Sequence, residues 1–179
     1  MAVSVWLDLL LLLLVVAAAV HDLATRRIPN RLLLAGGLGA LALHLCSATP
    51  LSAAGAGLSG ALTGLLLFLP LYCLRGMAAG DVKLLAAVGA FGAPGDVVQI
   101  AIWTMCAGGV MSLAVVIATG RVRAVGANLK CLVRPLLMRL AGMPAATEPL
   151  RGASVGSIPY GLAIACGTLW FIVQRYPAA

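Results

Sequence analysis

Six runs of apolar residues divide this chain, and they constrain its fold more than any other feature of the sequence. They cover about residues 3–20, 32–46, 53–74, 81–93, 97–119 and 158–174. About 20 apolar residues are enough for one helical crossing of a lipid bilayer, and a helix satisfies its own backbone hydrogen bonds there. We therefore expect an all-α polytopic membrane protein with about six transmembrane helices, built as a single domain over residues 1–179.

The composition excludes the soluble alternatives. Of the 179 residues, 63% are hydrophobic and only 9% are charged, whereas charged residues make up about 25% of an ordinary soluble domain. So few ionic groups cannot coat a water-soluble globule, and the chain is far too apolar to be disordered. The five cysteines form no CxxC pair, so we expect neither a zinc site nor a disulfide framework. We also expect no other metal and no cofactor.

The basic residues predict how the helices are oriented. The net charge is +7, but the cations lie in short connections, where they set membrane topology and meet lipid headgroups rather than bind nucleic acid. They gather in three connections: Arg26, Arg27 and Arg31; Arg75 and Lys83; and Arg121, Arg123, Lys130, Arg134, Arg139 and Arg151. Placing both termini outside puts every Lys and Arg except Arg175 in the cytoplasm, as the positive-inside rule favours.

The last of these connections is itself patterned. Apolar residues repeat there at helical spacing, with Arg123, Lys130 and Arg134 to one side: Val122, Val125, Leu129, Leu132, Val133, Leu136 and Leu140. This pattern predicts an amphipathic segment lying on the membrane surface, interrupted at Pro135. Elsewhere, the spacing of Gly60 and Gly64 is that of a close contact between membrane helices.

Five carboxylates remain to be explained, because ionisable groups are costly at membrane depth. Glu148 lies in a polar loop, Asp96 suits a Pro-Gly-Asp turn, and Asp8 is near enough to the outer end of its run to reach the headgroups. We expect structural roles for these three. Asp22 and Asp81 differ, because the predicted topology puts both at the cytoplasmic edge, on different helices.

Two carboxylates that face each other at a few ångströms share one proton, because both cannot ionise cheaply. The ionised one then activates a water while the protonated one polarises a carbonyl, which is the acid–base chemistry of an aspartic protease. The alternative is that each Asp is only a helix-end residue, and Asp81 at a helix N-terminus would be favourable on dipole grounds.

Three segments resemble motifs of a known family. They are Gly76-Met77-Ala78-Ala79-Gly80-Asp81-Val82-Lys83-Leu84; His21-Asp22-Leu23 followed by Arg26-Arg27-Ile28-Pro29-Asn30; and Ile158-Pro159-Tyr160-Gly161. The first resembles the GxGD signature of intramembrane aspartic proteases, in the form carried by type IV prepilin peptidases. The other two are similar to the first-aspartate and closing segments of that family. Ala78 stands where the pattern has its first glycine, and we expect the site to tolerate it.

The resemblance implies that Asp22 and Asp81 are catalytic. Supporting roles fall to the other motif residues: Ile28, Pro29, Asn30, Ala78, Gly80, Lys83, Pro159, Tyr160 and Gly161. It further implies cleavage of a prepilin leader at the cytoplasmic face of a bacterial inner membrane, after a glycine and before the hydrophobic segment of the pilin. Larger members add a CxxC-bearing domain that methylates the new N-terminus. None is expected here, so the chain resembles the short, peptidase-only members of tight-adherence (Flp) pilus systems.

Two other functions stay open at this point. A presenilin-like or signal-peptide-peptidase-like protease would share the two aspartates but cut inside the bilayer. A small transporter or proton relay would use Asp22 and Asp81 as ion ligands. His21 and the two aspartates supply too few ligands for a convincing divalent-metal site. The sequence leaves the oligomeric state and the individual substrates open.

Overall fold

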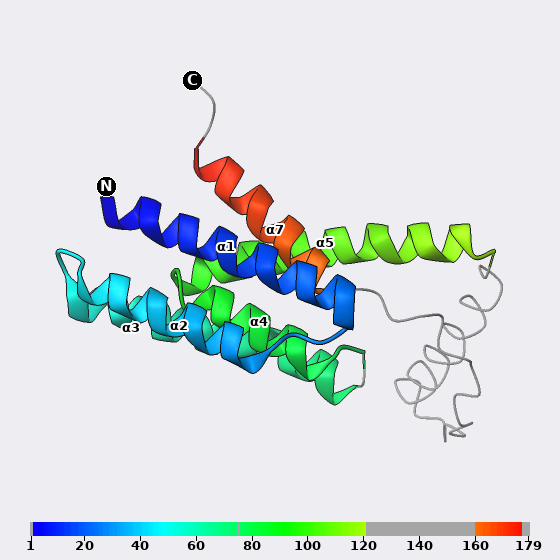
Figure 1. Cartoon of the computed structure of the whole chain (residues 1–179), viewed down its shortest axis with the longest axis horizontal. Coiled ribbons are helices and arrows are strands. Elements are labelled where there is room, and N and C mark those ends of the chain that lie inside the picture. Colours follow the sequence, from blue (N-terminus) through cyan, green and yellow to red (C-terminus); the bar gives the residue numbers. More distant parts are fainter. Residues whose placement is uncertain (1, 75, 121–159, 177–179) are drawn as a thin grey trace, which may run out of the picture. The chain divides into compact units, whose positions relative to one another are not determined.

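The computed structural model describes residues 2–74, 76–120 and 160–176, and the regular structure of these residues is entirely helical. The described helices are α1 (Ala2–Thr25), α2 (Asn30–Leu45), α3 (Pro50–Cys73), α4 (Ala79–Gly89), α5 (Pro94–Ala118) and α7 (Tyr160–Arg175) (Figure 1). Each coincides with one of the six apolar runs, which confirms the predicted all-α class. The predicted amphipathic segment around Pro135 lies outside the described residues.

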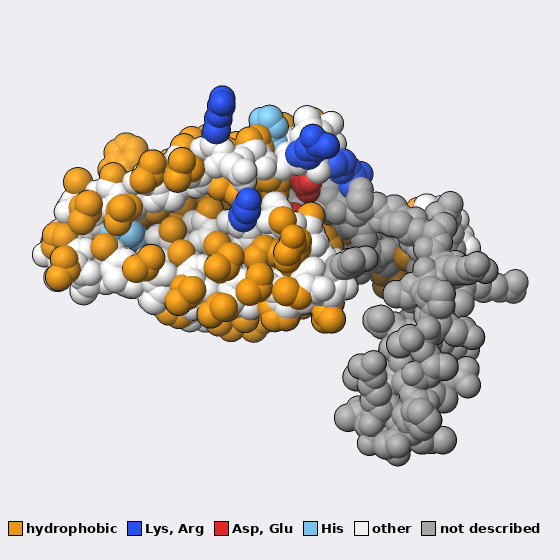
Figure 2. Space-filling model, turned by 90° about the horizontal axis from the view of Figure 1, so that it is seen from below, with side chains coloured by type: hydrophobic (Ala, Val, Ile, Leu, Met, Phe, Trp, Pro, Cys, Tyr) orange, Lys and Arg blue, Asp and Glu red, His pale blue; other side chains and the backbone are white. Residues whose placement is uncertain are grey.

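Three of these helices are long and apolar enough to cross a membrane: α1, α3 and α5, of 24, 24 and 25 residues. The shorter α2 is also apolar. Their outward surfaces carry large hydrophobic side chains, Leu13 at 66% and Leu58 at 75% exposed among them. Figure 2 shows hydrophobic side chains spread over much of the face that the structure describes, with basic side chains in the upper half of the view, some of them beside an acidic one. Such surfaces are those of a membrane protein.

Helix α4 differs from the prediction of a span reaching residue 93. It has 11 residues and ends at Gly89, so it rises only about 16 Å, roughly half of the hydrocarbon thickness. A turn over residues 90–93 then leads to Pro94, the first residue of α5. The residue before a proline disfavours helical dihedral angles. Gly89 and Gly92 also disfavour a longer helix, because glycine loses more conformational freedom in a helix than other residues.

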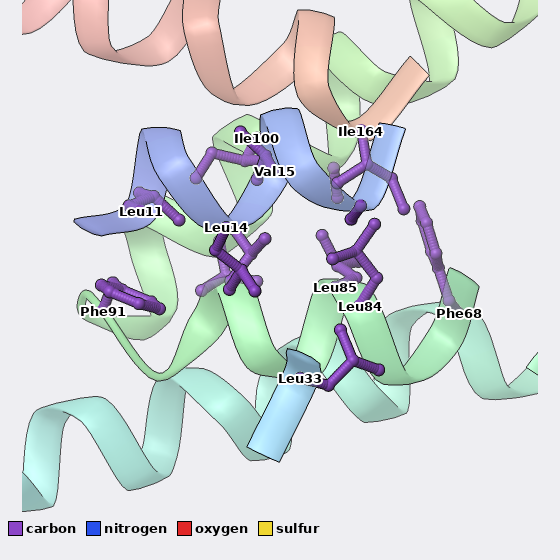
Figure 3. Packing of buried hydrophobic residues seen from close by; sticks show 14 of the residues in the cluster. Leu11, Leu14, Val15, Leu33, Phe68, Leu84, Leu85, Phe91, Ile100 and Ile164 are labelled. Carbon is purple, nitrogen blue, oxygen red and sulfur yellow. The ribbon is translucent and has the colours of Figure 1, made fainter. Parts of the chain in front are cut away.

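Contacts divide the chain into two units, which we describe separately. The first comprises Met1–Gly109 and Pro159–Ala179. In it, α1 packs against α2, α4 and α7, and α3 packs against α2 and α4. Leu11 and Val15 of α1, Leu84 and Leu85 of α4 and Ile164 of α7 belong to its buried hydrophobic cluster (Figure 3). Of the second unit, Val110–Ile158, the structure describes only residues 110–120, the end of α5 and the two residues after it. The single-domain assignment stays a prediction.

Glycines bring α3 directly against the backbone of α4. A Cβ at Gly64 would lie 2.5 Å from the Leu85 carbonyl oxygen, and one at Gly60 would overlap the carbonyl oxygen of Gly89. One turn earlier, a Cβ at Gly57 would lie 2.7 Å from the carbonyl oxygen of Ala90. The predicted close contact at Gly60 and Gly64 is therefore confirmed, and it holds α4, with Asp81 in its first turn, against a full-length membrane helix.

Candidate active site

Asp22 lies three residues before the end of α1, on the face that packs against α7. Its side chain is buried, with 7% of the residue exposed. The backbone N–H of Gly161, in the first turn of α7, donates a hydrogen bond of 2.9 Å to Asp22 Oδ2. The first N–H groups of a helix lack partners within the helix and favour a negative charge. The N-terminus of α7 thus both orients and stabilises the Asp22 carboxylate.

Gly161 is required for this contact. A Cβ there would lie 2.9 Å from both Cβ and Oδ2 of Asp22, which is closer than carbon and oxygen atoms pack. The neighbouring Tyr160 begins α7, and its ring lies against Gly108 of α5. Tyr160 therefore packs the first turn of α7 against α5. Pro159, the other residue of this motif, lies outside the described residues.

Asp81 is the third residue of α4 and is also buried, with 6% exposed. Its Oδ2 accepts a hydrogen bond of 3.3 Å from the backbone N–H of Ala78, the residue that caps the helix. This is one half of a capping box, and alanine has no side-chain oxygen to form the other half. Ala78 has φ −80° and ψ 151°, an extended conformation open to any residue. The position therefore does not require glycine for its dihedral angles.

The two carboxyl groups come from different helices. They are near enough for their charges to interact. Each uses its Oδ2 to accept the backbone hydrogen bond that orients it. Within the described part of the chain, no donor is bonded to Oδ1 of either Asp22 or Asp81. The arrangement is a buried pair of carboxylates whose second oxygens can contact a water or a substrate group.

The segment that joins α1 to α2 holds α4 in place beside Asp22. The Ile28 side chain packs over Gly80, where an added Cβ would meet it at an ordinary 3.6 Å. The Pro29 carbonyl accepts the N–H of Leu32 at the start of α2. Asn30 Oδ1 then accepts a hydrogen bond of 3.3 Å from the exposed Lys83 Nζ. The Arg-Arg-Ile-Pro-Asn motif therefore docks the first turn of α4, which carries Asp81, onto the end of α1.

At the other end of α1, the structure corrects the role expected for Asp8. This residue is 6% exposed and is engaged within the protein, so it does not reach out to headgroups. Asp8 Oδ1 accepts from Arg175 Nη1 at 3.0 Å, and Asp8 Oδ2 accepts from Tyr176 Oη at 2.8 Å. The carboxylate raises the pKa of the Tyr176 phenol, which keeps it a donor. Asp96 fits its predicted turn, because its Oδ2 accepts the Ala93 N–H at 3.1 Å.

Asp8, Arg175, Tyr176 and Asp96 form a second polar cluster, which sequence reasoning did not identify. The Arg175 guanidinium also lies 3.7 Å from Asp96 Oδ2 and stacks over the Phe171 ring, 5.3 Å from its centroid. Asp8 and Arg175 were both expected at the outer end of their spans, which was the available signal for an ion pair.

Among the described residues, no three His, Cys, Asp or Glu side chains are grouped as metal ligands. His44, which is buried, instead donates from Nε2 to the Ala90 carbonyl at 3.0 Å.

Comparison with known proteins agrees with these findings. The model of the type IV leader peptidase family matches residues 9–113, a segment that contains both Asp22 and Asp81. No curated protein and no solved structure matches the chain. The match covers more than half of the 179 residues. This membrane protein is therefore a peptidase of the type IV leader peptidase family.

Proposed function

We propose that the protein is a membrane-embedded aspartic endopeptidase in which Asp22 and Asp81 form the catalytic dyad. The observation that carries the proposal is the pair itself: two buried carboxylates on different helices, each oriented by one backbone N–H and each with a second oxygen that accepts no hydrogen bond from the residues that the structure describes. A buried acid pair in a peptidase has the chemistry to activate water without a metal or a covalent nucleophile.

The reaction follows from how the pair shares a proton. With one carboxyl group ionised and the other protonated, the ionised group takes a proton from a water molecule. That water attacks the scissile carbonyl, whose oxygen accepts a hydrogen bond from the protonated group. The proton gained by the base then passes to the departing amine. The backbone donors at Gly161 and Ala78 keep both groups in place throughout.

The charged surroundings of the dyad support a location at the cytoplasmic face of the bacterial inner membrane. Arg26, Arg27 and Arg31 are exposed just after Asp22, and Lys83 is exposed just after Asp81. Basic residues concentrate on the cytoplasmic side of membrane proteins. A scissile bond at that level lies at the membrane edge, where a leader meets the hydrophobic segment of its protein. Both termini would then face outward.

The proposed substrates are the leader peptides of type IV prepilins, specifically those of Flp-type pili. Support for leader-peptide substrates comes from the family, whose model describes type IV leader peptidases. A presenilin-like cut inside the bilayer, or a proton relay through the same aspartates, would not by itself require a leader-type substrate. The cleavage position separates these functions.

The test is direct cleavage by the full chain, purified in detergent and given a synthetic Flp-type prepilin peptide. Mass spectrometry of the products should show one cut after the leader glycine and before the hydrophobic segment. Cuts within the hydrophobic segment would instead favour the presenilin-like function. Intact peptide, with proton or ion flux in liposomes that hold the protein, would favour the relay and refute the peptidase proposal.

A further inference from the structure

Helices α1 and α7 run antiparallel and are joined by polar contacts at both ends. At one end, the Gly161 N–H binds Asp22; at the other, Arg175 and Tyr176 bind Asp8. Asp8 precedes Asp22 by 14 residues, and Gly161 precedes Arg175 by the same 14. On each helix, the stretch between the two contact residues rises about 21 Å. Because the two stretches are equal in length, a contact made at one end brings the other pair into register.

The residues between these ends follow the same spacing on both helices. On α1, five of the buried residues recur at intervals of three and four: Asp8, Leu11, Val15, Ala18 and Asp22. On α7, the same intervals give Gly161, Ile164, Thr168, Phe171 and Arg175. This is the spacing of a seam between two packed helices. The apolar middle of such a seam does not by itself choose one register.

Within the seam between α1 and α7, two features leave the choice of register to its ends. In lipid, apolar side chains gain little by leaving the bilayer for a partner helix, so polar contacts and close packing decide the arrangement. The middle of the seam offers one hydroxyl, Thr168 Oγ1, and it donates to the Ile164 carbonyl of its own helix at 2.8 Å. A slip of one turn would move α7 by about 5.4 Å and take the Gly161 N–H away from Asp22.

We propose that Asp8, Arg175 and Tyr176 form a register clamp that positions the N-terminus of α7 on Asp22 from the opposite end of the two helices. They are positioning residues and do not touch the substrate. The proposal rests on the proposed peptidase function, since it assigns them to the same site. It also predicts a structural quantity, the register of α7 on α1, that can be measured without activity.

The kinetic experiment replaces both charges together, so that no buried charge is left unpaired. In a full chain whose native cysteines are replaced by serine, Asp8→Cys is combined with Arg175→Cys, and cleavage of the prepilin peptide is measured. With the thiols reduced, kcat should fall about tenfold to a hundredfold, as expected for a misplaced catalytic group. KM should stay within about twofold, because substrate binding groups are intact.

Linking the two thiols with a short, reducible bis-methanethiosulfonate should restore kcat to nearly the parental value, and dithiothreitol should remove the gain. The matched control is Leu9→Cys with Gln174→Cys, which places the thiols on exposed neighbours of the clamp and should keep the parental kcat. Parental kcat in the reduced clamp variant, or no recovery in the crosslinked one, would overturn the proposal. Since the same molecules are compared before and after crosslinking, misfolding does not explain recovery.

The register itself is read by pulsed electron paramagnetic resonance. Nitroxide labels at the exposed Val20 and Leu169 should give one narrow distance with the clamp intact. Asp8→Asn with Arg175→Gln should broaden or shift that distance by several ångströms, about one turn. An unchanged distribution would refute the clamp even if the peptidase proposal holds. If the parent fails to cleave while the clamp variant shifts, the peptidase proposal fails and the clamp stands as a structural device.

Discussion

The substitution Gly161→Ala tests the support of Asp22 by α7. The added methyl would lie 2.9 Å from Cβ and Oδ2 of Asp22 and 3.2 Å from its Cγ. Carbon atoms in contact are about 3.5–4.0 Å apart, so the first turn of α7 must retreat by roughly 0.6–1 Å. That movement stretches the Gly161 N–H bond to Asp22, now 2.9 Å, beyond the distance of a useful hydrogen bond.

The expected losses of stability and of kcat follow from these distances. Losing a hydrogen bond to a charged group costs about 1.5–3 kcal/mol, and crowding in a packed site costs about 1–3 kcal/mol. The two are not additive, since the retreat that loses the bond also relieves the crowding. For the reaction, a displaced carboxylate should lower kcat by about tenfold to a hundredfold.

The assay is prepilin-peptide cleavage by purified variants, with thermal unfolding in the same detergent as a control. Gly37→Ala is the matched substitution, because a Cβ at Gly37 meets nothing within 4 Å; it should leave the rate unchanged and should not lower the stability. Gly161→Ala that cleaves at the rate of Gly37→Ala would show that the Gly161 contact does not position Asp22, and the argument would be wrong.

Three further predictions follow from the packing and the charges. Gly60→Ala should lower stability by about 1–3 kcal/mol, because its Cβ would overlap the backbone carbonyl oxygens of Gly89 and Gly92; an unchanged unfolding temperature would contradict this contact. Gly80→Ala should change stability by less than about 0.5 kcal/mol, because its Cβ meets Ile28 at an ordinary 3.6 Å; a large loss in the same melting assay would contradict that contact. A topology reporter fused at Met143 should be cytoplasmic and one at Thr49 outside; both on one side would refute the proposed orientation.

The sequence predicted the helical elements well. Hydrophobic runs are long and unambiguous in a membrane protein, so every described helix falls on a predicted run. The end of α4 was missed, because the apolar run continues through Phe91 and hydropathy does not register where a helix stops. The docking of α4 by Ile28 and Asn30 depends on a loop conformation, which residue types alone do not specify.

The carboxylates, too, were only partly predictable from the sequence. Asp22 and Asp81 could be singled out by motif and topology, but the donor at Gly161 is a backbone group that no side-chain pattern reveals. Asp8 was misjudged because its partner, Arg175, lies 167 residues away. Only the antiparallel packing of α1 and α7 brings these two charges together, at the same distance along both helices from the contact between Asp22 and Gly161.

The most direct test of the central claim is isosteric removal of each carboxylate. An amide can neither share the proton of the pair nor act as its base, so Asp22→Asn and Asp81→Asn should each abolish cleavage of the prepilin peptide. The double variant should lose no more than either single one, because the two groups work as a unit. Equal membrane insertion of all three variants is the control.

Single-turnover cleavage by well-inserted Asp81→Asn is the decisive measurement. The dyad predicts no product above the uncatalysed background over many half-lives of the wild-type reaction. Leader removal by Asp81→Asn at a rate near that of the wild type would contradict the aspartic-protease account.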